Sequence, residues 1–473
     1  MVDTGPVRTS GRSVASRVGI WRAPGTPAHR ALADRLRLLI LDGRLPLDTE
    51  FPGERELAGA LDVSRTTVTS AYRHLREQGY LVARGRARSR TTLPAARPGV
   101  PTIDDHPPAE WIDFAHAAPE APGQTLHAAF ATALTVLPRH LARHGYAGTG
   151  LDALRDAVAR RYTARGLPTR RDQILVTNGA QHAFGLVVGT LLEPGSRVVV
   201  ENPTYPHALT ALHAARCRLL PVPVSDDGWD LDTLRQTCDG AALAYLVPDF
   251  HNPTGNLLDD HDRARLQLGC PVVVDETMAD LALDTPPARP MAAHHRDVVS
   301  IGSVSKTFWG GLRIGWIRAE PRLLARIDRH RPAVDLGSPV FEQLAAATLL
   351  DDIDSLLPQR QQQLRRRREH LISEIERLLP DWRVRRPSGG LAVWTRLPQP
   401  YSSALATHCR DFGLLLAAGP AFGARGEVFE NRLRLPYTHD TDTLTAGITS
   451  IATCLAERNL RAPQNSTTRT PLA

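Results

Sequence analysis

The chain has 473 residues, of which 42% are hydrophobic and 23% charged, with a formal net charge of +7. This balance is typical of a folded chain of two or three domains and excludes collagen-like or wholly disordered proteins. No apolar stretch approaches the roughly 18 residues of a membrane span. The five scattered cysteines suit neither a disulfide framework nor a Cys-rich metal site. We therefore expect a cytoplasmic protein with no membrane partner and no metal.

Two counts of charged residues carry more information. Residues 1–94 hold 16 Arg against 9 acidic residues, a net of +7, whereas residues 95–473 hold 41 basic and 41 acidic residues. A local basic excess indicates a polyanion partner, although a solvated Arg-rich surface has the same composition. Of the 57 basic residues, 56 are Arg, and Lys306 is the only lysine. Because a guanidinium does not release its proton, Lys306 is the candidate for chemistry that needs a neutral amine.

The first predicted folded unit spans residues 26–93 and follows a basic tail over residues 1–25 that we expect to be disordered. Helical spacing predicts a helix over 28–41, a second helix from Pro52, and a third from the N-cap Ser64 to Gly79. The predicted inward residues are Leu32, Leu36, Leu39, Ile40, Leu57, Ala58, Leu61, Val68, Ala71, Tyr72 and Leu75. Two short strand-like segments with a basic turn between them follow, which is the order of a winged helix-turn-helix.

A helix-turn-helix places the start of its second helix in the major groove of DNA. The residues there are Ser64, Arg65, Thr66 and Thr67, and Arg65 has the fork that pairs with guanine. Contacts to phosphates or the minor groove suit Arg55 on the preceding helix and Arg84, Arg86 and Arg88 on the wing. The alternative is a helical hairpin used only for protein contact.

This unit resembles the GntR family of winged-helix regulators. The resemblance rests on the acidic-Arg-acidic-Leu run of the second helix, on VSRTTV at the third, and on the GYL strand start. Wings of that family usually carry a Gly-Ser-Gly turn, whereas this one reads GRARSR, which favours a more electrostatic grip on DNA. The resemblance implies double-stranded operator DNA as a partner.

A Pro-rich linker over residues 94–110 is expected to be semi-rigid. From residue 111 to about 460, short apolar runs such as SRVVVENP, PVVVDE and VVSIGSVS alternate with amphipathic helices. This pattern predicts an α/β unit with a mostly parallel sheet covered by helices on both faces. Residues 461–473 are expected to form a disordered tail.

Lys306 follows an apolar run in SVSKTFWGGLRIGW, close to Ser303, Ser305 and Arg313. Ser hydroxyls and a forked Arg are suitable phosphate ligands, and an amine near other cations can form a Schiff base. Pyridoxal 5'-phosphate (PLP) offers both an aldehyde and a phosphate, and it needs a carboxylate at its pyridine nitrogen. Asp275, at the end of PVVVDE, is the candidate carboxylate.

The large unit resembles the fold type I aminotransferases over roughly residues 111–455, with a smaller C-terminal part. The resemblance rests on HGYAGTG, TNGAQHAF, ENPTYPHA, HNPTGN, PVVVDE, SVSKTFWGGLR and NRLRLPY. It implies a Schiff-base role for Lys306 and a grip on a substrate carboxylate for Arg434. The implied cofactor-binding residues are Tyr146 (toward the neighbouring subunit's cofactor), Gly179, Ala180, Gln181, Tyr205, Asn252, Asp275, Ser303, Ser305 and Arg313.

One position departs from that family. A tyrosine that bonds the cofactor's ring hydroxyl usually follows the pyridinium aspartate, but DETMADL places Thr277 and Met278 there. Asn252 would then carry that hydrogen bond, alone or with Thr277. This departure weakens the case for fast transamination more than the case for cofactor binding.

Both units in this order resemble the MocR/GabR subfamily of GntR regulators. The resemblance implies a head-to-tail homodimer that binds PLP as an aldimine and senses an amino compound or the cofactor itself. Two alternatives remain: an active aminotransferase with an appended DNA-binding unit, and a regulator whose large unit is only a dimerisation scaffold. The effector, the operator sequence and the sign of regulation are not readable from the sequence.

Overall fold

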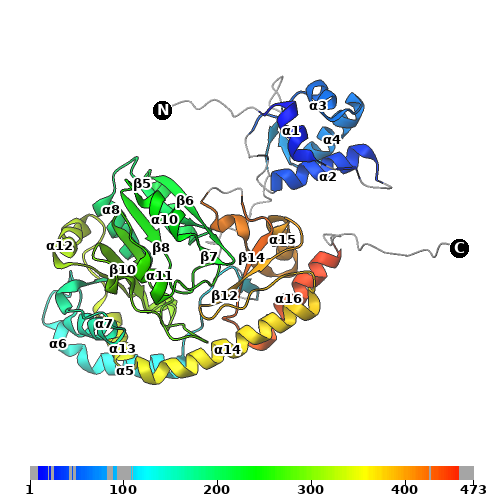
Figure 1. Cartoon of the computed structure of the whole chain (residues 1–473). Helices are drawn as coiled ribbons and strands as arrows, with labels where there is room; N and C mark the ends of the chain where they lie inside the picture. Colours follow the sequence, from blue (N-terminus) through cyan, green and yellow to red (C-terminus); the bar gives the residue numbers. More distant parts are fainter. Residues whose placement is uncertain are drawn as a thin grey trace.

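The computed structural model describes most of the 473-residue chain (Figure 1). The described residues are 9–19, 21–22, 26–41, 45, 49–82, 89–92, 108, 110–424 and 428–457. The wing turn with Arg84, Arg86 and Arg88, nearly all of the linker, and the C-terminal tail lie outside these ranges.

The N-terminal unit has four helices and a two-stranded antiparallel sheet within the described residues. Their bounds are α1 (Gly11–Val18), α2 (Ala28–Leu41), α3 (Glu54–Leu61), α4 (Arg65–Glu77), β1 (Leu81–Val82) and β2 (Arg90–Thr91). The predicted helix over 28–41 is confirmed, and so is the N-cap of α4, where the Ser64 hydroxyl accepts the Thr67 N–H at 3.1 Å. All the predicted inward residues are buried except Leu61, which is partly buried.

Helix α1 lies inside the segment that the sequence predicts to be a disordered tail, so that prediction needs correction for Gly11–Val18. The Ser10 side chain caps the helix, and Val14 and Val18 are fully buried against the N-terminal core. The Gly11 N–H donates to a carboxylate oxygen of Glu56 on α3 at 2.7 Å. An eight-residue helix has little stability alone, and this one is held by contacts with a segment 45 residues away.

The large unit is built on an eight-stranded sheet with the order β4-β11-β10-β9-β8-β5-β6-β7. The strands are β4 (Ile174–Thr177), β5 (Arg197–Asn202), β6 (Arg218–Ser225), β7 (Gly228–Trp229), β8 (Leu243–Leu246), β9 (Val272–Asp275), β10 (Val298–Ser303) and β11 (Gly315–Arg318). Strands β10, β9, β8, β5 and β6 are parallel neighbours, whereas β11 and β7 run antiparallel to their partners. The predicted α/β unit with a mostly parallel sheet is confirmed.

Helices cover both faces of this sheet, which explains why its strands are apolar along their whole length. Val273 packs on one face with α8, α9 and α12, and its neighbours Val272 and Val274 pack on the other with α10. The helices are α5 (Gly123–Val136), α6 (Pro138–Leu141), α7 (Asp152–Ala164), α8 (Ala180–Leu191), α9 (Pro206–Ala214), α10 (Leu231–Cys238), α11 (Asp260–Arg265), α12 (Pro321–His330) and α13 (Val340–Asp351). A third cluster joins α5, α7 and α13.

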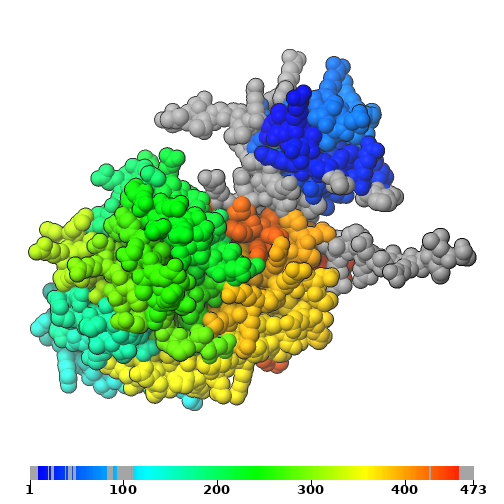
Figure 2. All heavy atoms as spheres, viewed as in Figure 1, coloured from blue at the N-terminus to red at the C-terminus, as the bar shows by residue number. Residues whose placement is uncertain are grey.

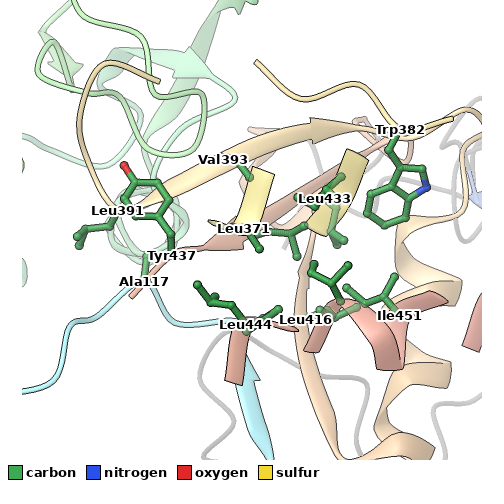
Figure 3. Packing of buried hydrophobic residues seen from close by; sticks show 14 of the residues in the cluster. Ala117, Leu371, Trp382, Leu391, Val393, Leu416, Leu433, Tyr437, Leu444 and Ile451 are labelled. Carbon is green, nitrogen blue, oxygen red and sulfur yellow. The ribbon is translucent and has the colours of Figure 1, made fainter. Parts of the chain in front are cut away.

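A smaller part holds a four-stranded sheet with the order β12-β14-β13-β3. Its elements are β3 (Ile112–Phe114), β12 (Ala392–Arg396), β13 (Leu414–Ala418), β14 (Arg432–Pro436), α15 (Ser402–Cys409) and α16 (Thr441–Glu457). Strand β3 precedes the large sheet in the chain, so the smaller part is not purely C-terminal. Figure 3 shows the core of this part, where Leu371, Val393, Leu416 and Leu433 pack together.

Helix α14 (Ile353–Leu378) connects the two parts of the large unit and runs along one edge of it (Figure 1). In Figure 2 the green atoms of the large-sheet part and the orange atoms of the smaller part lie directly against each other. Six short 3-10 helices complete the described elements: Arg171–Gln173, Met291–Ala293, Gly310–Leu312, Arg331–Ala333, Arg410–Phe412 and Gly419–Phe422. Within the described ranges, no helix has the length and apolarity needed to cross a membrane.

Candidate functional site

The predicted site residues of the large unit gather where several strands end. Asp275 ends β9, Ser303 ends β10, and Gly179 follows β4 by two residues. These strands point in the same direction, because β4 and β10 are both antiparallel to β11. The carboxyl ends of parallel strands are where open α/β sheets bind ligands.

Lys306 lies in this cluster and is partly buried, and its Nζ donates to the Ala117 carbonyl at 2.9 Å. Desolvation and the charge of Arg434 lower the pKa of Lys306 to about 8, and Asp275 opposes that change. A sizeable fraction of this amine is therefore neutral near neutral pH, as a nucleophilic lysine requires. The only lysine of the chain therefore lies in an environment that favours a neutral amine, as its uniqueness among the basic residues predicted.

Asp275 is buried, and three donors hold its carboxylate. Oδ1 accepts from the Thr277 N–H at 3.0 Å and from the Thr277 hydroxyl at 2.7 Å, and Oδ2 accepts from the Tyr245 hydroxyl at 2.9 Å. Burial raises the pKa of Asp275, and these hydrogen bonds and the Lys306 charge oppose the rise. The Thr277 hydroxyl is thus engaged with Asp275.

The segment around Gly179 lies against Arg313, whose Nη2 donates to the Asn178 carbonyl at 3.0 Å. Gly179 has φ +89° and precedes the first residue of α8, Ala180, where backbone N–H groups are free for an anion. A Cβ at Gly179 would lie 2.8 Å from Arg313 Nη2, so a larger residue would push the guanidinium away. Arg313 itself adopts a left-handed backbone (φ 51°), which is uncommon outside glycine and clusters at functional sites.

Two serines lie in the segment that leads to Lys306. The Ser303 hydroxyl donates to the Ile314 carbonyl at 2.9 Å and contacts the Ser305 hydroxyl at 2.8 Å. The Ser305 N–H donates to Ser303 Oγ at 3.1 Å, which fixes the turn that leads into Lys306. The turn therefore holds the two hydroxyls and the amine in one short segment.

Arg434 connects the smaller sheet to this cluster. It lies on β14, is 4% exposed, and donates to the Asn252 side-chain oxygen at 3.2 Å and to the Ala115 carbonyl. Its guanidinium stacks 4.9 Å from the Phe422 ring centroid. Burial lowers the pKa of Arg434 to about 10, and its Nε has no hydrogen-bond partner among the described residues. A buried donor without a partner costs free energy, so the Arg434 guanidinium is suited to bind an anion.

Tyr205 and Tyr146 differ in where the structure places them. Tyr205 is half-buried, and its ring meets His207 edge-on at 5.1 Å, next to the carbonyl that accepts from Gln181. Tyr146 is 65% exposed and stacks near His144 instead. The chain therefore brings Tyr205 to the cluster but leaves Tyr146 on the surface.

The recognition helix presents the other predicted site. Ser64, Arg65 and Thr66 are exposed, Thr67 is half-buried, and Arg55 is exposed on α3. The Ser64 hydroxyl also contacts the hydroxyls of Thr66 and Thr67 at 2.9 and 2.8 Å. These contacts order the start of α4 before any nucleic acid is present.

Two residues near these sites were not predicted from the sequence. Glu54 Oε2 accepts from the Thr69 hydroxyl at 2.7 Å and lies 3.7 Å from Arg65 Nε, beside the recognition helix. Tyr245 reaches Asp275 from the neighbouring strand β8. A polar ring inside the apolar run ALAYLV was the only signal for Tyr245, and the acidic start of α3 was the only signal for Glu54.

Comparison with known families agrees with this layout. Residues 111–451 match the family "Aminotransferase class I and II", and residues 28–90 match "Bacterial regulatory proteins, gntR family". The chain therefore belongs to the aminotransferase class I and II family over most of its length and carries a GntR-type helix-turn-helix in front. This pairing makes it a regulator of the MocR-type subfamily.

Several relatives share the two-unit layout or the large unit. The uncharacterized HTH-type transcriptional regulator YisV of Bacillus subtilis is 28% identical, over 79% of this chain and 84% of its own. The probable rhizopine catabolism regulatory protein MocR of Rhizobium meliloti is 29% identical, over 76% of this chain and 80% of its own. A Thermus thermophilus 2-aminoadipate transaminase is 30% identical over 63% of this chain and 79% of its own.

A solved structure gives the same picture for the large unit. The α-aminoadipate aminotransferase LysN of Thermus thermophilus, complexed with N-(5'-phosphopyridoxyl)-L-leucine, superposes with a TM-score of 0.68 at 27% identity. The match covers 74% of this chain and 93% of that one. The large unit therefore has the aminotransferase fold.

Proposed function

We propose that this regulator binds pyridoxal phosphate at Lys306 and reports the presence of a carboxylate-bearing amine to its DNA-binding unit. The observation that carries the proposal is the partly buried Lys306 amine, whose pKa is lowered to about 8 by burial and Arg434. It is the only lysine of the chain, and it lies between one carboxylate, Asp275, and the guanidiniums of Arg313 and Arg434.

The residues present fit the cofactor's phosphate. The cradle of Gly179, Ala180, Gln181, Ser303, Ser305 and Arg313 combines a helix N-terminus, two hydroxyls and a guanidinium, and a Cβ at Gly179 would clash with it. These are the donors that phosphate binding uses. We infer that this segment holds the phosphate.

The remaining residues fit the ring. Asp275 is a buried carboxylate suited to the pyridine nitrogen, Asn252 to the ring hydroxyl, and Tyr205 to the ring face. When bound, pyridoxal phosphate supplies an aldehyde that captures amines covalently. Tyr245 and Thr277 hold the Asp275 carboxylate in place, and Lys306 supplies an amine that can lose its proton near neutral pH.

Arg434 is proposed to bind the effector's carboxylate. Its buried guanidinium has an unused Nε donor and lies on the smaller sheet, while its Nη1 contacts Asn252 of the large-sheet part. A carboxylate there would pair as a fork and draw the two parts together. Ligand binding can change DNA affinity only by favouring one arrangement of the units over another.

The experiment is a spectrum of the full-length protein with added pyridoxal phosphate. Wild type should develop a visible band distinct from the free cofactor, and Lys306→Ala should not. Gln267→Glu, an exposed change away from the cluster, should behave as wild type. A wild-type band in the Lys306→Ala protein would remove the assignment.

On the DNA side, we propose that Ser64, Arg65, Thr66 and Thr67 face the major groove and that Arg55 contacts phosphate. Their exposure and the capped, ordered start of α4 support this. Arg84, Arg86 and Arg88 remain predicted wing contacts, since they lie outside the described residues.

We also propose that two chains associate through the surface that carries Tyr146. Five large apolar side chains are exposed on residues 134–146 and 334–336: Leu134, Leu141, Tyr146, Val334 and Leu336. Tyr146 and Leu336 are brought near each other by their chain neighbours, because a Cβ at Gly337 would lie 3.1 Å from the Ala147 carbonyl oxygen. Exposed apolar clusters mark interfaces, and Tyr146 would then serve the partner's site in a head-to-tail homodimer.

An active aminotransferase is the second candidate, because a 2-aminoadipate transaminase shares 30% identity with this chain. Thr277 and Met278 stand where the family tyrosine is expected, and the Thr277 hydroxyl is bound to Asp275. We therefore expect weak or absent turnover. Steady conversion of an amino acid and a 2-oxoacid by the loaded protein would favour this second candidate.

A further inference from the structure

One cavity of the large unit lies away from Lys306. It has a volume of about 670 Å³, which is within the size range of small-molecule sites. It lies between the N-terminus of α5 and the middle of α14, which are neighbours along one edge of the large unit (Figure 1). Lys306, Asp275, Arg313 and Arg434 do not line it, so it is separate from the proposed cofactor site.

Three arginines of α14 line this cavity: Arg360, Arg366 and Arg367. Arg367 is 7% exposed and donates to the Thr438 carbonyl. Arg360 donates to the carbonyls of Glu120 and Phe308 at 2.8 and 3.1 Å. Among the described residues, no carboxylate lies within the 4.0 Å of an ion pair with these three guanidiniums. Arg367 is buried, Arg360 is partly buried and Arg366 is exposed. A buried cation is normally paired with an anion, so Arg367 in particular is left without an ion-pair partner among the described residues.

The two acidic residues that line the cavity do not supply that partner. Asp440 caps the start of α16: one of its carboxylate oxygens accepts from the Thr443 N–H and the other from the Thr443 hydroxyl. Glu120 is exposed, and the charges of Glu120 and Asp440 both oppose the lowering of the pKa of Arg367 without forming an ion pair with it. Burial lowers the pKa of Arg360, and the neighbouring charge of Arg367 lowers it further. The two guanidiniums lie about two turns apart on the same helix, and their like charges repel each other.

The start of α5 adds further donors. Gly123, Gln124 and Thr125 line the cavity, and the cap residue Pro122 makes no side-chain hydrogen bond to them. The first N–H groups of a helix have no partner inside it, and they favour an anion. The same wall carries neutral amide side chains from Gln359, Gln362 and Gln363.

We propose that this cavity is a second ligand site that binds a small molecule through a phosphate dianion. A phosphate carries about −1.5 to −2 charges near pH 7 and can bond both Arg360 and Arg367, whereas a single carboxylate would neutralise only one of them. The site goes beyond the proposed cofactor function and needs neither Lys306 nor Arg313.

The position of this site links it to the Lys306 cluster. Thr307 and Phe308 line the cavity and directly follow Lys306. A second segment also joins the two sites. Glu120, which lines the cavity, lies three residues after Ala117, whose carbonyl accepts from Lys306 Nζ. An anion bound between α5 and α14 would therefore order both segments that hold the lysine.

The test uses inorganic phosphate and glycerol 3-phosphate as probes, with acetate as the monocarboxylate control. Binding to the full-length protein is followed by calorimetry and by the rise in melting temperature. It is measured on protein loaded with pyridoxal phosphate and again on Arg313→Gln, so that the Gly179 cradle cannot be the site measured. We expect one phosphate per chain, bound at least tenfold more tightly than acetate, in both proteins.

Two variants locate the site. Arg360→Gln removes a cation and also two hydrogen bonds to carbonyls, so it changes local stability as well as charge. Gln363→Glu keeps those bonds and places a carboxylate beside Arg360, whose Nη1 lies 3.4 Å from the Gln363 side-chain oxygen. Both should weaken phosphate binding at least tenfold, whereas Gln267→Glu, the same charge change on another exposed surface, should not.

Three results would overturn the proposal. The first is phosphate affinity unchanged by Gln363→Glu. The second is binding that disappears in Arg313→Gln, which would assign the phosphate to the Gly179 cradle. The third is acetate that binds as tightly as phosphate, or no binding at all.

Discussion

The recognition-helix surface and the Lys306 site both gather cations, but they hold them in opposite ways. The Arg65 side chain is 59% exposed and has Glu54 within 3.7 Å, whereas Arg434 is 4% exposed and has an unsatisfied Nε. Exposed charges act mainly through their sum and are screened by salt. A buried charge responds to each of its neighbours, because electrostatic interactions are stronger where water is excluded. The DNA affinity of the N-terminal unit should therefore depend mainly on how many charges it carries. Ligand binding at the Lys306 site should depend on where each charge lies.

The largest difference between the two units should appear when one buried leucine in each core is replaced by alanine. Leu36 and Leu371 are both fully buried, and Leu→Ala costs about 2–5 kcal/mol. A domain of the size of the N-terminal unit has only about 5 kcal/mol of stability to lose. Leu36→Ala should abolish DNA binding and leave the cofactor band intact. Melting curves with a gel shift check this, and loss of both properties together would show that the units are not independent.

The next effect concerns the reactivity of Lys306. With a pKa of about 8, the neutral fraction at pH 7 is about 200-fold larger than for an ordinary lysine near pKa 10.4. Acylation of unloaded protein, followed on the peptide that carries the only lysine, should show a midpoint near pH 8. The midpoint should move toward 10.4 in denaturant.

Two variants sharpen this measurement because their effects have opposite sign. Arg434 lowers the pKa of Lys306 and Asp275 raises it. Arg434→Gln should therefore move the midpoint up, and Asp275→Asn should move it down. A folded protein with a midpoint above 10 would contradict the account of the site.

Smaller effects are expected at the recognition helix. If Arg65 pairs with guanine, Arg65→Ala should cost about 1–3 kcal/mol on the preferred operator and relax the preference there. Arg55→Gln should instead weaken binding to all sequences and flatten the plot of log affinity against log salt by about 0.9. Arg377→Gln, an exposed change in the neutral large unit, is the control. Equal slopes for all three proteins would refute the assignment.

The smallest change is predicted for Glu54→Gln. It removes a negative charge 3.7 Å from Arg65 and 3.9 Å from Arg76, so DNA affinity at low salt should rise by less than tenfold. The variant should lose less than about 1 kcal/mol of stability, since both ion pairs are long and their arginines are solvent-accessible. A fall in DNA affinity would mean that Glu54 orients Arg65 for its contact.

The sequence predicted what local pattern controls. Helix α2 and the core face of α4 follow from apolar spacing and from a capping serine, so both agree with the structure. The single lysine among 57 basic residues indicated an amine with a chemical role before the fold was known. Helix α1 was missed, because it is held by a contact between Gly11 and Glu56 that no local pattern records.

The details of the site depended on contacts across the sheet. Tyr245 and Asp275 lie on neighbouring strands, and their contact follows from strand order, which a single sequence does not reveal. The same holds for Arg434 and Asn252, which are 182 residues apart. The cavity between α5 and α14 could not be anticipated, since helix packing alone creates it.

The central claim is that occupation of the Arg434 site changes DNA affinity. The most direct measurement is a gel shift with protein loaded with pyridoxal phosphate, titrated with a panel of carboxylate-bearing amines, for wild type and Arg434→Ala. We predict that an effective amine changes the operator affinity of wild type, and that Arg434→Ala keeps the visible cofactor band but loses the response. A full response in Arg434→Ala to every effective amine would contradict the claim and leave the free cofactor as the leading effector.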